Sequence, residues 1–178
     1  SRFERVRRRC ERVFKGRFPR VAMGEANNIS FDISGDDVVE VRASPAMEAA
    51  KNLEAYKAAG AALAGKKDWK GALDEYEKAV VAYDACKETL SCDFEAERIG
   101  EKVMLASLSN QSLCSLKLEN FEEAKRLASL CVKRLKEARV IDESAVAKCL
   151  FRKGQASLGL GDARGAVDFL AEAVRLEE

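Results

Sequence analysis

The 178-residue chain contains no histidine and no CxxC pair, and these absences exclude the commonest zinc sites. Zinc is usually held by histidine nitrogens and closely spaced cysteine thiolates. Histidine is also the side chain that most often acts as a general acid or base. No glycine-rich phosphate loop follows a strand pattern, and no serine or cysteine has an evident catalytic partner. We therefore expect no catalytic residues, no metal, no cofactor and no small-molecule substrate.

Proline and long apolar runs are also scarce. The chain has only two prolines, 47% hydrophobic residues and 34% charged residues, which is typical of a mostly helical globular domain. It has no apolar run of about 18 residues that would span a membrane, and its first residues lack the apolar core of a secretory signal. We expect a cytoplasmic protein, with the nucleus as an additional compartment.

The chain has six cysteines: Cys10, Cys86, Cys92, Cys114, Cys131 and Cys149. Their scattered spacing suits neither a zinc site nor a compact disulfide framework. The last three fall where helices need small apolar residues. We therefore expect reduced cysteines that pack in the core.

Positive charge is concentrated at the N-terminus, although the net charge is only +1. Residues 1–20 hold nine of the 31 lysines and arginines but only two of the 30 acidic residues. Apolar residues recur there at helical spacing: Phe3, Val6, Cys10, Val13 and Phe14. Residues 2–15 are therefore predicted to form a basic amphipathic helix. Such a helix packs on the rest of the chain, or contacts nucleic acid or an anionic membrane, or serves as a nuclear signal.

Helical periodicity stops between Phe18 and Pro45. Apolar residues alternate on either side of Ser34-Gly35-Asp36-Asp37, at Ile29, Phe31 and Ile33 and then at Val39 and Val41. This pattern predicts a short β-hairpin or an extended linker. We expect residues 1–45 to hold the basic helix and this segment, and residues 46–178 to form one domain.

The stretch Glu54–Ala79 has a pattern of small and aromatic residues that returns twice more. A helix is predicted from about Pro45 to Ala64, and a second helix begins at Trp69. When the repeats are aligned on Ala72, Ala124 and Ala166, the position four residues earlier is Asp68, Asn120 and Asp162. These residue types accept the free N–H groups at a helix start, so the same break is specified three times.

The pattern predicts an all-α fold of three helix-turn-helix units. The aligned alanines are 52 and 42 residues apart, so the first interval needs extended helices around a loop near Ser91–Phe94. Residues 54–87, 105–138 and 147–178 resemble three tetratricopeptide repeats (TPRs), and residues 46–178 are similar to the TPR domains of FKBP-type immunophilins and other heat-shock co-chaperones. The resemblance implies a right-handed superhelix with a peptide-binding groove. Immunophilins carry a prolyl isomerase domain, and residues 1–45 are too few to hold one, so such a domain could exist only outside this chain.

In co-chaperone members of this family, five polar residues form a carboxylate clamp for a C-terminal Glu-Glu-Val-Asp peptide. The resemblance assigns four of these positions to Lys57, Asn110, Lys148 and Arg152. The fifth, an asparagine in the family, is Ala61 here. Lys148 and Arg152 are four residues apart, so the two like charges share a helix face, an arrangement that a carboxylate ligand would favour.

The resemblance therefore implies a non-catalytic interaction module that binds the acidic C-terminal tail of a 90-kDa or 70-kDa heat-shock chaperone. Loss of one clamp residue would weaken such a site by about tenfold to a hundredfold. The alternative is a TPR adaptor that binds another protein, with residues 1–20 contacting RNA or an anionic membrane.

Overall fold

The structure is a computed structural model that describes residues 30–33, 37–40, 44–138 and 142–176. The chain divides into two compact units between Ser44 and Pro45. The predicted basic helix over residues 2–15 lies outside the described residues.

The first unit contains an antiparallel β-hairpin of β1 (Ser30–Ile33) and β2 (Asp37–Glu40). Phe31 is opposite Val39 and Ile33 is opposite Asp37. The β-hairpin expected from the alternating residues is therefore present. Asp37, which the sequence pattern places in the turn, is already the first residue of β2.

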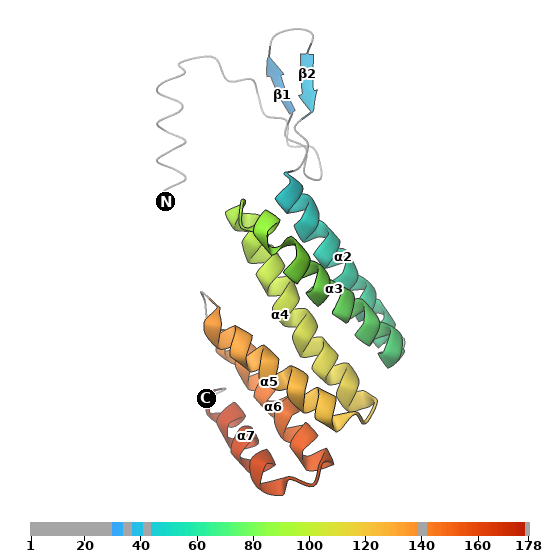
Figure 1. Ribbon diagram of the computed structural model, residues 1–178, viewed down its shortest axis with the longest axis vertical. Helices are drawn as coiled ribbons and strands as arrows, with labels where there is room; N and C mark the ends of the chain where they lie inside the picture. The colour runs from blue at the N-terminus through green and yellow to red at the C-terminus, as the bar shows by residue number, and fades with distance from the viewer. Residues whose placement is uncertain (1–29, 34–36, 41–43, 139–141, 177–178) are drawn as a thin grey trace. The chain divides into compact units, whose positions relative to one another are not determined.

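The second unit is an array of helices in the described residues 45–175 (Figure 1): α2 (Pro45–Gly65), α3 (Trp69–Leu90), α4 (Phe94–Lys117), α5 (Phe121–Glu137), α6 (Glu143–Gly159) and α7 (Ala163–Arg175). Each helix packs on the next, α2 also packs on α4, and α4 on α6. The chain therefore forms three stacked helical hairpins whose first helices line up in one layer. This is the TPR-like, all-α superhelical fold that the repeats predict.

The three predicted caps are confirmed. Asp68, Asn120 and Asp162 each precede the second helix of a hairpin. Their side-chain oxygens accept a hydrogen bond from the backbone N–H three residues later, at 3.0, 3.4 and 2.9 Å respectively. The predicted loop is also present, because α3 ends at Leu90 and Asp93 caps α4. The 52-residue interval is accommodated by lengthening these two helices to 22 and 24 residues.

The residue before each cap has a left-handed backbone conformation. Lys67, Glu119 and Gly161 have φ values of 63°, 57° and 77°. In each turn, the cap backbone N–H bonds to a carbonyl five residues earlier: Asp68 to Leu63, Asn120 to Ser115 and Asp162 to Ser157, at 2.9–3.0 Å. These bonds satisfy a carbonyl at the end of the first helix, as in a Schellman motif.

Small residues allow the helices of each hairpin to approach closely. A Cβ atom at Gly60 would lie 2.8 Å from the Tyr76 ring, and one at Gly154 would lie 2.7 Å from Leu170. In the middle hairpin the equivalent residue is Ser112, which is fully buried. Its hydroxyl donates a hydrogen bond to the Ala124 carbonyl at 3.0 Å. Ser112, the atypical residue of the second repeat, therefore preserves the close approach of α4 and α5, and its buried hydroxyl has a hydrogen-bond partner.

Candidate functional site

A cavity of ≈ 700 Å³ opens between α4, the N-terminal half of α6 and the C-terminal parts of α3 and α5. We call it the groove cavity. Residues that bear on its chemistry include Glu101, Leu105, Ser109, Asn110, Lys148 and Arg152. The structure therefore brings together three of the four residues that the sequence assigns to a clamp. Lys57, the fourth, does not line this cavity.

Arg152 is held in place by α4. Its Nη1 atom donates hydrogen bonds to the Ser109 carbonyl oxygen and, at 2.5 Å, to Ser109 Oγ. Both bonds use the same nitrogen, and the remaining guanidinium N–H groups have no hydrogen-bond partner among the described residues. The side chain is therefore oriented across the floor of the groove with donors left for a ligand.

The positive charges of Lys148 and Arg152 are not neutralised locally. In the described part of the chain, no carboxylate lies within salt-bridge distance of either side chain. The charge of Arg152 also affects its neighbours. Burial raises the pKa of the Cys114 thiol, and the positive charge of Arg152 opposes that rise. The floor of the groove thus favours anionic groups.

A buried tyrosine interacts with Asn110. Tyr76 of α3 is only 3% exposed. Burial raises the pKa of its hydroxyl, while a hydrogen bond with Asn110 and the charge of Arg152 act in the opposite direction. The Tyr76 ring also packs beneath Gly60 of α2. One side chain therefore links the first hairpin to the polar residues of the groove cavity.

Lys57 and Ala61 lie on α2 and do not line the groove cavity. Lys57 is half-buried and Ala61 is exposed. Lys57 precedes Gly60 by three residues, so the two share a helix face beside the Tyr76 ring. The first hairpin therefore places neither Lys57 nor Ala61 in the groove cavity, and it has a methyl group at the position that the resemblance assigns to an asparagine.

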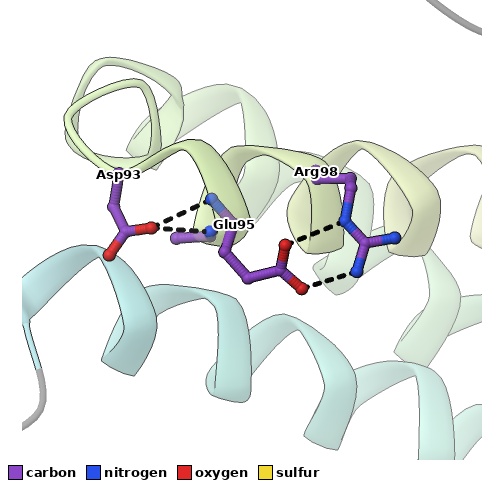
Figure 2. A network of polar contacts seen from close by, with 4 residues as sticks. Asp93, Glu95 and Arg98 are labelled. Atoms are coloured by element: carbon purple, nitrogen blue, oxygen red, sulfur yellow. Dashed lines mark hydrogen bonds and ion pairs between the residues drawn. The ribbon is translucent and has the colours of Figure 1, made fainter. Parts of the chain in front are cut away.

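The far end of the groove cavity has mixed charge. Figure 2 shows the start of α4, where Asp93 Oδ1 accepts hydrogen bonds from the N–H groups of Glu95 and Ala96 at 3.0 and 3.1 Å. Both Glu95 carboxylate oxygens accept from Arg98, at 3.0 and 2.5 Å. The hydrogen bond from Arg98 lowers the pKa of Glu95. Arg98 lines the cavity, but two nitrogens of its guanidinium group already donate to Glu95.

A second cavity of ≈ 800 Å³ lies between α4, α6 and α7. Lys148 and Arg152 line this cavity as well as the first. Its other lining residues are mainly apolar and include Leu113, Leu170 and the half-exposed Phe151. The two cationic side chains therefore line both cavities, and the second cavity has the more apolar lining.

Ser109 and Tyr76 were not predicted as site residues. Tyr76 is visible in the sequence as part of the repeat pattern, but the pattern identifies it only as a core residue. Ser109 precedes Asn110 directly, and nothing in its sequence context marks it as the anchor of an arginine on another helix. Cys114, Cys131 and Cys149 are free and buried, as expected of core cysteines, whereas Cys86 is half-buried and Cys92 is exposed. Cys10 lies outside the described residues.

No protein-family model matches the chain. The fold is similar to a solved structure, the N-terminal domain of stress-induced protein-1 (STI-1) from C. elegans, with a TM-score of 0.56 and 20% sequence identity. The match covers 72% of this chain and 86% of that domain. Within the described residues, no cluster of potential metal ligands and no helix suited to crossing a membrane is found. The likeness establishes a TPR-like fold, a class whose superhelix presents an extended concave binding surface.

Proposed function

We propose that the chain is a non-catalytic, co-chaperone-like interaction module. Its groove would bind the acidic C-terminal peptide of a 90-kDa or 70-kDa heat-shock chaperone. The observation that carries this proposal is the presence of Asn110, Lys148 and Arg152 in one cavity, with Arg152 oriented by Ser109 and no carboxylate paired with either cation in the described chain. The similar solved structure is a domain of a stress-induced protein, which agrees with a partner of the heat-shock class.

The chemistry of a peptide C-terminus suits this cavity. A terminal aspartate supplies two carboxylates, its own and that of its side chain. The unoccupied guanidinium N–H groups of Arg152 would bind one carboxylate, and the mobile ammonium of Lys148 would bind the other. The Asn110 amide would donate a neutral hydrogen bond between them.

The first hairpin makes the clamp partial. The Ala61 side chain has no donor, and Lys57 does not line the groove cavity. Each charge-assisted hydrogen bond contributes roughly 1.5–3 kcal/mol, so two well-placed cations are enough for a measurable but modest affinity. We expect a complex weaker than one with all five clamp residues.

The proposal is tested by titrating the protein with two peptides that end in Glu-Glu-Val-Asp. One has a free C-terminal carboxylate and the other a C-terminal amide. Isothermal titration calorimetry should show at least about tenfold tighter binding of the free acid, because the amide removes one charge-assisted partner. Equal affinities would refute recognition of the terminus.

A pair of lysine variants separates a specific site from general attraction. Lys148 and Lys102 both line the groove cavity, but only Lys148 occupies a clamp position. Lys148→Ala should weaken binding of the free-acid peptide by about tenfold. Lys102→Ala removes the same charge from the same cavity and should have a much smaller effect. Similar losses of affinity in the two variants would indicate that the peptide is attracted only by the general positive charge of the cavity.

A further inference from the structure

Two buried thiols meet between the second and third hairpins. Cys131 of α5 and Cys149 of α6 are 1% and 0% exposed, and their Sγ atoms are 3.2 Å apart. Both cysteines are free. A disulfide bond is about 2.05 Å long, so the sulfur atoms would have to approach by only about 1.2 Å to be bonded.

The surroundings of the pair are polar on one side. Cys149 Sγ lies 3.4 Å from Ser109 Oγ, the same hydroxyl oxygen that accepts from Arg152. Cys131 Sγ lies 3.5 Å from the Leu105 carbonyl oxygen. When Cys149 loses its proton, the Cys131 thiol and the Ser109 hydroxyl can both donate to the resulting thiolate.

These contacts favour the reactive form of Cys149. The hydrogen bond between the two thiols lowers the pKa of Cys149; burial opposes this, while Ser109 and the charge of Arg152 assist. The pKa of Cys131 is raised, mainly by the same hydrogen bond. Loss of a proton from the pair is therefore favoured at Cys149, and a thiolate beside a thiol is the combination that reacts with oxidants and then closes a disulfide.

Cys114 provides an internal comparison. It is also buried, but it packs with Ala72 and Tyr76 in a separate cluster. Within the described residues no other thiol is its hydrogen-bond partner, and burial raises its pKa. Its environment is that of an inert core cysteine, so it serves as a matched control.

A small oxidant can approach the pair from the side of Cys131, and Cys149 Sγ lies 3.2 Å from Cys131 Sγ. Cys131 lines the groove cavity, which is open to solvent and has a volume of ≈ 700 Å³. Hydrogen peroxide is little larger than water, so it can enter a cavity of that size. A bulky thiol reagent would meet side chains that cover almost all of both cysteines.

We propose that Cys131 and Cys149 form a dithiol site that hydrogen peroxide oxidises to an intrachain disulfide between α5 and α6. The Cys149 thiolate attacks one peroxide oxygen, the O–O bond breaks, and hydroxide leaves to give a sulfenic acid. The Cys131 sulfur then attacks the sulfenyl sulfur, which releases a second hydroxide. The two thiol protons neutralise the hydroxides to water. Two electrons pass from the sulfur pair to one molecule of peroxide.

The test uses the full chain, fully reduced and then treated with hydrogen peroxide at neutral pH. After quenching, the protein is denatured and alkylated, and its peptides are identified by mass spectrometry. The six alkylatable thiols should fall to four, with a cross-linked peptide that contains Cys131 and Cys149. A reductant should restore all six. The proposal is overturned if both cysteines stay alkylatable, or if the cross-links join other cysteines.

Two variants refine the result. Cys149→Ser should abolish the cross-link and leave Cys131 alkylatable, whereas Cys114→Ser should retain the Cys131 to Cys149 cross-link. Circular dichroism confirms that each variant is folded. Loss of the cross-link in folded Cys114→Ser protein would contradict a site defined by the contact of Cys131 and Cys149. Because the readout requires no peptide ligand, failure here is distinguishable from failure of the proposed function.

Discussion

The turns of the three hairpins are alike in geometry, whereas the groove positions of their first helices differ. Each turn has a left-handed residue, a capping side chain and the same backbone hydrogen bond, although the left-handed residue is lysine, glutamate or glycine. Of the positions that the resemblance assigns to a clamp, Lys57 and Ala61 of α2 do not line the groove cavity, whereas Asn110 of α4 and Lys148 and Arg152 of α6 do. The repeats therefore share the interactions that close each hairpin, and differ in the side chains that a bound ligand would contact.

This difference separates the stability of the fold from its recognition chemistry. A turn depends on backbone hydrogen bonds and one short polar side chain, so several residues can satisfy it. The groove depends on the charge and reach of individual side chains, so one substitution changes the site. Four predictions test this separation, in order of decreasing effect.

Arg152→Ala should weaken binding of the free-acid peptide by about tenfold to a hundredfold, since it removes a charge-assisted donor. The measurement is isothermal titration calorimetry. Arg98→Ala is the control, because Arg98 lines the same cavity but is engaged by Glu95. The control should change affinity by less than about fivefold, as expected for an exposed ion pair. Comparable losses would remove Arg152 from the site.

Ala61→Asn should strengthen binding of the same peptide by about two- to tenfold, because one neutral hydrogen bond contributes about 0.5–1.5 kcal/mol. The side chain is exposed on α2, so the amide should not disturb the packing of the first hairpin. Ala62→Asn, at a neighbouring exposed position, is the matched control. An unchanged affinity in Ala61→Asn would show that α2 does not reach the bound peptide.

Gly161→Ala should destabilise the fold by about 1 kcal/mol, since its φ of 77° strains any residue with a Cβ atom. Lys67→Gly should instead stabilise the fold by a fraction of that amount, because it relieves the same strain at φ 63°. Chemical denaturation measures both. Peptide affinity should be unchanged in the two variants, and a large loss of affinity would mean that turns and groove are coupled.

Asp162→Asn should have the smallest effect, because asparagine caps a helix about as well as aspartate. The hydrogen bond from the Gly165 N–H, followed by the ion pair with Lys125, lowers the pKa of Asp162 from its usual 3.8. A carboxylate with a lowered pKa stabilises the folded state above its unfolded pKa, and that stabilisation is lost as the pH falls through the folded pKa. Wild-type protein should therefore exceed the variant in melting temperature at pH 7. This difference in melting temperature should disappear in acid. A difference that does not change with pH would contradict a stabilising role for the ionised Asp162 carboxylate.

The sequence predicts the helices and turns well because their causes are local. Asp68, Asn120 and Asp162 act on backbone groups three residues away, so their spacing is sufficient to place each helix start. Asn110, Lys148 and Arg152 could be selected only through resemblance to a family, because their convergence depends on packing of α4 against α6.

Other features could not be predicted because they arise from distant parts of the chain. Ser109 and Arg152 are 43 residues apart in sequence. Cys131 and Cys149 are 18 residues apart and lack any familiar cysteine spacing. Helix packing brings each pair together, and no periodic pattern in the sequence records which side chains meet across two helices.

The anchoring of Arg152 by Ser109 has a kinetic consequence. A guanidinium that is already oriented loses little further freedom when a carboxylate binds. The mobile Lys148 ammonium is suited to attracting an approaching anion, so its removal should mainly slow association and reduce the dependence of that rate on salt. Removal of Arg152 should mainly shorten the lifetime of the complex. Lys148 and Arg152, a single helical turn apart, would then control the association rate and the dissociation rate of the peptide separately.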